Sequence, residues 1–164
     1  GDPEDDATEV GPLVSQSQRE RVMDYIEIGR AEGATIVVGG EVPSDPAFAD
    51  GAYLMPTVFD NVTNDMRIAR EEIFGPVLSI LTFRTPAEAV EKANNTPYGL
   101  SAGIWTEKGS RILWMADKMR AGVVWANTFN RFDPTSPFGG YKESGFGREG
   151  GMHGLHAYVR LEDR

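Results

Sequence analysis

The chain has 164 residues, of which 40% are hydrophobic and 25% charged, as in an ordinary globular domain. Twenty-five acidic residues against 16 basic ones give a net charge of −9, and a net-acidic chain repels phosphate backbones, which argues against a nucleic-acid partner. The absence of cysteine excludes a disulfide scaffold, a cysteine zinc site and a cysteine nucleophile within these residues.

No apolar run approaches the ~18 residues that cross a membrane, so we expect no membrane association. The opening residues 1–6 are acidic and lack the basic region of a secretory signal. An acidic chain without such a signal is expected in the cytoplasm.

The first half of the chain alternates helix and strand signals. Residues 1–12 contain two prolines and several acids, and they predict a solvated arm. Ser15 and Ser17 both have the spacing of a capping box and predict a helix that ends at Gly33. The elements expected next are a strand over 34–38, a turn-rich stretch over 41–52, an extended segment over 53–62 in which Pro56 favours an edge strand, and a helical turn over 65–72.

The second half predicts strands joined by helices. Strands are expected over 77–83, 100–105 and 123–126, and helices over 85–94 and from Thr106 to Gly122. Strands joined in this way pair in parallel with right-handed crossovers. The predicted fold class is therefore α/β, with an open, mostly parallel sheet and helical crossovers. Ligands bind at the carboxyl ends of such strands, so the loop over 127–138 and the glycine-rich tract behind it are the expected site.

Two motifs invite a functional interpretation that their context does not support. Residues 145–150 match G-x-G-x-x-G, but no strand is expected before them and only 14 residues follow, so tight turns are favoured over a dinucleotide fingerprint. His153 and His156 could share a helical face, but no further ligand stands at a metal-site spacing, and we expect no metal.

Two other groups leave alternatives open. Glu71 and Glu72 are either solvated or functional, although adjacent side chains on a helix diverge by about 100° and do not flank one substrate bond as a glycosidase pair would. The loop after the last predicted strand carries three aromatic rings, which form either a lid over the core or a substrate wall: Phe129, Phe132 and Phe138.

Three segments together resemble one family. Arg70–Val77 reads R-E-E-I-F-G-P-V, Asn94–Ala102 reads N-N-T-P-Y-G-L-S-A, and Pro137–Glu149 reads P-F-G-G-Y-K-E-S-G-F-G-R-E. These segments are similar, in the same order, to signatures of the NAD(P)-dependent aldehyde dehydrogenases. The opening, Gly1–Ser15, also fits, so the resemblance extends from Gly1 to about Tyr158.

The resemblance implies that residues 1–158 are the C-terminal portion of an aldehyde dehydrogenase catalytic domain. Residues 159–164 would begin an oligomerisation strand. Such a parent enzyme oxidises a small-molecule aldehyde to a carboxylic acid with NAD or NADP, through a thiohemiacetal on a cysteine that lies outside this chain, and it is a homo-oligomer. The chain alone is then expected to be inactive. The alternative is a non-catalytic aldehyde dehydrogenase-like domain used for assembly or binding.

The resemblance also implies roles for four residues, none of them catalytic. Glu72 would bind the nicotinamide ribose hydroxyls, because one carboxylate accepts two hydrogen bonds from a vicinal diol. Phe74 would pack beside the nicotinamide. Phe132 and Phe138 would line the substrate mouth, where an apolar wall suits the tail of an aldehyde.

Overall fold

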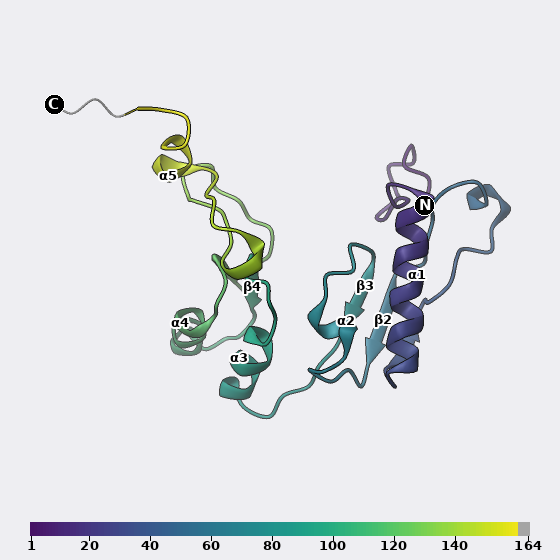
Figure 1. Cartoon of the computed structure of the whole chain (residues 1–164), viewed down its shortest axis with the longest axis horizontal. Coiled ribbons are helices and arrows are strands. Elements are labelled where there is room, and N and C mark those ends of the chain that lie inside the picture. Colours follow the sequence, from purple (N-terminus) through teal and green to yellow (C-terminus); the bar gives the residue numbers. More distant parts are fainter. Residues whose placement is uncertain (161–164) are drawn as a thin grey trace. The chain divides into compact units, whose positions relative to one another are not determined.

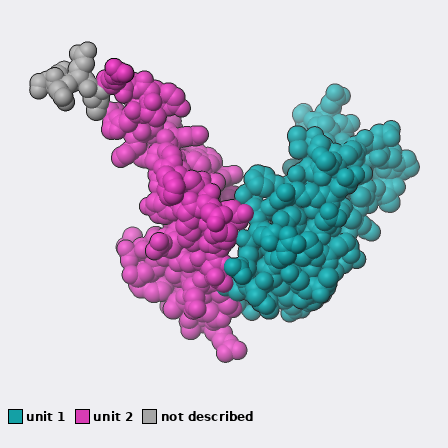
Figure 2. Space-filling view, viewed as in Figure 1, with its two compact units in different colours: residues 1–82 teal, residues 83–164 magenta. Residues whose placement is uncertain are grey.

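The structure, a computed structural model, describes residues 1–160. The chain divides into two compact units, one of residues 1–82 and one that begins at Phe83 (Figure 2). Within the described residues each unit has its own sheet, and two of the three strand pairings are parallel. The predicted α/β class with an open, mostly parallel arrangement of strands is therefore confirmed, although the strands form two sheets where one was predicted. No helix within residues 1–160 is long and apolar enough to cross a membrane.

The first unit is organised around helix α1 (Gln16–Ala31), which the sequence predicted. The Ser15 hydroxyl accepts a hydrogen bond from the Gln18 backbone amide at 3.1 Å and caps the helix. Val22 and Ile26 lie on the buried face of α1 and pack in the same core as Phe59 of the sheet. The arm over residues 1–12 has no helix or strand, as expected.

The sheet of the first unit runs beside α1 (Figure 1). It consists of β1 (Thr35–Val38), β2 (Thr57–Asp60) and β3 (Val77–Ser79), in the order β1-β2-β3. The central place of β2 shows that the edge position inferred from Pro56 is wrong. Pro56 precedes the strand, and the ladder begins with the Thr57 amide, which donates to the Pro76 carbonyl at 2.8 Å, so the missing proline N–H removes no ladder bond.

The two faces of this sheet differ in what covers them. Phe59 faces α1 and is fully buried. On the other face the register aligns Val38, Val58 and Leu78 in one row across all three strands. Val38 and Leu78 are more than half exposed in this chain. Strands that are apolar on both faces are typical of a sheet covered on both sides.

The second unit alternates helices and strands as predicted. Its elements are α3 (Pro86–Asn94), β4 (Ser101–Ile104), α4 (Gly109–Lys118) and β5 (Val123–Ala126), with β4 and β5 parallel. Thr85 caps α3 as expected. Helix α4 begins at Gly109 and not at Thr106, because the Asn127 side chain bonds both the amide and the carbonyl of Thr106 and holds it beside the end of β5.

The strand expected over 77–83 differs most from the structure. Strand β3 ends at Ser79 and pairs with β2, so β3, β4 and β5 do not form one sheet within the described residues. The Ser79 hydroxyl donates to the Ile68 carbonyl, which ties β3 to the first unit. The pairing of a strand depends on partners far away in sequence, which a helix–strand alternation does not specify.

Short elements complete the chain. They are η1 (Pro46–Phe48), α2 (Arg67–Arg70), η2 (Lys142–Ser144) and α5 (Gly151–Leu155). Val159 and Arg160 form no strand, and the rest of the expected oligomerisation strand, residues 161–164, lies outside the described residues.

Candidate functional site

The segment that follows α2 presents two side chains to solvent. Glu72 is exposed, and within residues 1–160 it has no hydrogen-bond or ion-pair partner. Phe74 is 69% exposed and has a φ of 57°, in the left-handed region that bulky residues avoid. A large ring held in that conformation costs of the order of 1–3 kcal/mol, and such strain is typical of functional sites.

Helix α1 fixes this segment through hydrogen bonds and close packing. The Gln18 side-chain amide donates to the carbonyls of Ile73 at 3.3 Å and of Phe74 at 2.9 Å. The Ile73 side chain is buried in the core. Gly75 packs so closely on Val22 that a Cβ at this glycine would overlap the valine methyl groups. The sharp exit at Phe74-Gly75 is therefore rigid, with Glu72 and Phe74 on its outer side.

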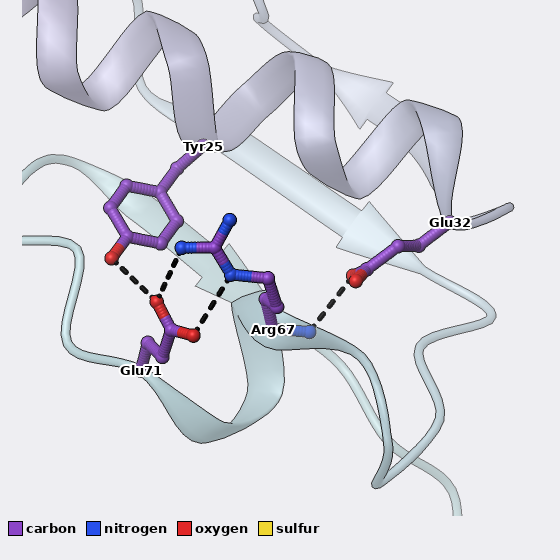
Figure 3. Close-up of polar contacts among 4 residues, drawn as sticks. All are labelled: Tyr25, Glu32, Arg67 and Glu71. Atoms are coloured by element: carbon purple, nitrogen blue, oxygen red, sulfur yellow. Dashed lines mark hydrogen bonds and ion pairs between the residues drawn. The ribbon is translucent and has the colours of Figure 1, made fainter.

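The side chain of the neighbouring Glu71 is 39% exposed but hydrogen-bonded, so the interpretation of Glu71 as an unpaired surface side chain is wrong. Its carboxylate accepts two hydrogen bonds from the Arg67 guanidinium, at 2.9 and 2.8 Å, and one from the Tyr25 hydroxyl at 2.8 Å (Figure 3). These bonds lower the pKa of Glu71 to about 2. The bond to Glu71 also raises the pKa of Tyr25, so the phenol keeps its proton. The two adjacent glutamates thus differ completely in their surroundings.

The second unit carries a cluster of rings after β5. Trp125 is buried, and its indole N–H donates to the Arg131 carbonyl at 3.1 Å. Phe132 and Phe138 contact each other edge to face at 4.9 Å between ring centroids, and both contact Trp125. Phe129 packs edge-on against the same indole. Phe129 and Phe132 remain more than half exposed, so the rings cover Trp125 and also offer an apolar surface outward.

The glycine-rich tract forms tight turns, as its sequence context favoured. Gly145 and Gly150 have φ of 93° and 70°, which suit glycine. Phe138 and Glu149 form an antiparallel bridge with two hydrogen bonds of 2.7 Å, so the tract folds back on itself. The Arg148 guanidinium donates to the carbonyls of Gly140 and Gly147 inside this turn. The bridge sets the backbone position of the Phe138 ring.

Sequence reasoning missed that the second and third motifs bind each other. The Lys142 ammonium donates to the carbonyls of Asn94 at 3.0 Å and Thr96 at 2.9 Å. The Ser144 hydroxyl accepts from the Gly99 amide at 3.0 Å. These residues lie more than 40 positions apart, and only their common place within family signatures could have pointed to the contact. The lysine and serine of the third motif therefore have structural roles in this chain.

The two histidines near the end of the described chain lie 6.2 Å apart between ring centroids. Within residues 1–160 there is no group of three His, Cys, Asp or Glu side chains that could hold a metal ion. The structure does not bring His153 and His156 together with a further ligand.

Comparison with known proteins gives a consistent result. The model of the aldehyde dehydrogenase family matches residues 1–163. A betaine aldehyde dehydrogenase of Rhizobium etli is 50% identical over 162 residues, 99% of this chain and 33% of that protein. A putative aldehyde dehydrogenase of Bacillus subtilis, DhaS, is 50% identical over 155 residues, 94% of this chain and 30% of that protein.

Solved structures agree with these relatives. The indole-3-acetaldehyde dehydrogenase AldA of P. syringae, in complex with NAD+ and IAA, superposes with a TM-score of 0.93 at 48% identity, covering 99% of this chain and 32% of that one. The chain thus spans about a third of the length of the relatives it matches. It belongs to the aldehyde dehydrogenase family.

Proposed function

We propose that this chain is the C-terminal portion of the catalytic domain of an enzyme that oxidises an aldehyde to a carboxylic acid with NAD or NADP. The nucleophilic cysteine, which would form the thiohemiacetal, lies outside these residues, because the chain has no cysteine. Family membership and the names of the relatives support the reaction class. Solved relatives in complex with NAD+ support NAD as the cofactor, with NADP as the second possibility.

The observation that carries the proposal is the contrast between Glu71 and Glu72. Three hydrogen bonds occupy both carboxylate oxygens of Glu71, whereas Glu72 is exposed beside it on a rigid segment. A free carboxylate in a fixed place is suited to accept both hydroxyls of the nicotinamide ribose. The exposed, conformationally strained Phe74 offers a ring face for the nicotinamide. These residues fit the cofactor, which when bound accepts the hydride from the substrate.

The aromatic cluster of the second unit supplies the proposed substrate wall. Phe132 presents an exposed ring, and Phe138 supports it edge to face. An apolar wall favours aldehydes with an apolar or aromatic tail over small polar ones. The relatives are named for different aldehydes, so the identity of the tail must come from experiment.

The test compares two matched substitutions in the full-length parent enzyme. Glu72→Gln keeps the size but removes the charge and one acceptor oxygen, and Glu20→Gln changes an exposed glutamate on α1 as the control. Because misplacement by about 1 Å can cost roughly 100-fold in rate, we expect Glu72→Gln to slow single-turnover NADH formation by about 10- to 100-fold. Cofactor affinity should fall less. Equal rates for the two variants would remove the ribose assignment, and a parent that oxidises no aldehyde would favour the non-catalytic alternative.

A further inference from the structure

The groups that surround Glu71 form a network that joins α1 to both ends of α2 (Figure 3). Glu32, which follows α1, accepts a hydrogen bond from the Arg67 backbone amide at 2.8 Å, at the first residue of α2. Tyr25, on α1, donates to Glu71, the residue that follows and caps the end of α2. The Arg67 guanidinium lies over the Tyr25 ring, 5.5 Å from its centroid, while it binds Glu71. The single turn of α2 is therefore tied to α1 at its start and at its end.

This network also stands at one end of the segment that carries Glu72 and Phe74. Glu71 has an extended backbone, with φ −109° and ψ 146°, so its side chain and that of Glu72 leave the chain on opposite sides. Anchoring Glu71 inward consequently directs Glu72 outward. At the other end of the segment, Gln18 holds the carbonyl of Phe74.

The two attachment points are seven residues apart on α1. Gln18 and Tyr25 therefore lie on the same face of the helix, about 10 Å apart along its axis at 1.5 Å per residue. Val22 lies between them on that face and packs against Gly75. One rigid helix thus fixes both ends of the segment.

We infer that Glu71, anchored by Arg67 and Tyr25, is a positioning residue that holds Glu72 and Phe74 in place for the cofactor. The inference rests on the proposed function of Glu72. Both carboxylate oxygens of Glu71 are occupied, so it acts through its neighbours and not by contact with the cofactor. Because the hydrogen bonds keep Glu71 ionised, the bidentate pair with Arg67 is present throughout the neutral pH range.

The variants are chosen to loosen the network without removing volume. Tyr25→Phe deletes only the hydroxyl that reaches Glu71, and Tyr53→Phe is the control on a tyrosine whose hydroxyl has no hydrogen bond within residues 1–160. Glu71→Gln breaks the bidentate pair with Arg67, and Glu20→Gln is its control. In the parent enzyme, single-turnover NADH formation and cofactor dissociation constants are measured for all four. We expect Tyr25→Phe and Glu71→Gln to slow hydride transfer by about 10-fold or more while cofactor affinity changes less.

A second readout needs no activity and uses the 164-residue chain itself. Chymotrypsin cleaves after aromatic residues, and cleavage after Phe74 requires the segment to open locally. Losing one hydrogen bond of the network should speed this cleavage by about fivefold, which is the population shift expected from such a bond. The double variant of Tyr25 and Glu71 should speed cleavage by less than the product of the two single effects, because both residues belong to one hydrogen-bonded network.

The outcomes separate this inference from the proposed function. Normal hydride transfer in Glu71→Gln, beside slow transfer in Glu72→Gln, would overturn the positioning role and leave the function in place. Normal hydride transfer in both Glu71→Gln and Glu72→Gln would contradict the assignment of Glu72 to the cofactor, and the positioning role of Glu71 would fall with it. Slow transfer with unchanged cleavage after Phe74 would overturn the positioning role, because the segment would then be held as firmly as in the wild type. Loss of helicity in both Tyr25→Phe and Glu71→Gln would show that the network acts on the fold as a whole and not on the segment.

Discussion

The left-handed backbone of Phe74 leads to an unusual prediction: replacement of this residue by glycine should leave the protein more stable than replacement by alanine. Phe74 has a φ of 57°, a conformation that glycine adopts freely and alanine does not. Leu78, in the extended strand β3, is exposed to a comparable degree, 57% against 69%, and serves as the reference position. The perturbation is the replacement of each residue by alanine and by glycine in separate variants.

The expected differences in stability follow from the backbone conformations at positions 74 and 78. A left-handed conformation costs an L-residue about 1–2 kcal/mol, and glycine loses about 0.5–1 kcal/mol relative to alanine through its freer unfolded chain. Glycine at position 74 should therefore be more stable than alanine there by about 0.5–1 kcal/mol. At position 78 the order should reverse by a similar amount, because glycine weakens a strand. Since only about a third of the Phe74 ring is buried, Phe74→Gly should be close to neutral overall.

The assay is native-state amide hydrogen exchange at Val22 and Ile26, which lie in the core of the first unit and report its opening free energy. Each alanine variant is compared with the glycine variant at the same position, so the lost side chain cancels. If alanine is the more stable replacement at position 74, the left-handed backbone does not carry strain and the reasoning about this segment is wrong.

Three further predictions concern other parts of the chain. In the parent enzyme, Phe132→Ala and Phe138→Ala should raise KM for bulky aldehydes by the equivalent of about 1–3 kcal/mol and change KM for acetaldehyde less, and equal effects on both substrates would assign the rings to the fold. Folding should lower the pKa of Glu71 from 4.5 to about 2, so its contribution to stability is present above pH 4.5 and is lost as the pH falls through 2. The free energy of unfolding should therefore fall less steeply with decreasing pH in Glu71→Gln than in the wild type. Identical pH dependences in the two proteins would contradict the ion pair. The isolated chain should self-associate through the exposed apolar face of its first sheet. The double variant Leu78→Lys with Ile80→Lys should lower the molecular mass measured by light scattering. A wild-type chain that stays monomeric at high concentration would exclude such an interface.

Local signals in the sequence were sufficient for the helices. The Ser15 cap and the spacing of Val22 and Ile26 predict α1 because both are decided within a few residues. The cap at Thr85 gives the start of α3 for the same reason. Strand pairing could not be predicted in this way, because the pairing of β3 with β2 depends on contacts between residues that are distant in sequence.

Only part of the candidate site could be predicted from the sequence. The family signatures pointed to Glu72 and Phe74, but they did not distinguish the surroundings of Glu71 from those of Glu72. Arg67 stands four residues before Glu71, a spacing that favours an ion pair on a helical turn and could have indicated it. The third partner, Tyr25, lies 46 residues away, beyond any local pattern.

The most direct test is an experimental structure of the parent enzyme with its dinucleotide bound. We expect the two carboxylate oxygens of Glu72 to lie within about 2.5–3.2 Å of the two hydroxyls of the nicotinamide ribose. Glu71 should still accept its hydrogen bonds from Arg67 and Tyr25. A Glu72 carboxylate that lies beyond hydrogen-bond distance of the ribose, or a Glu71 that has left Arg67 to bind it, would contradict the account.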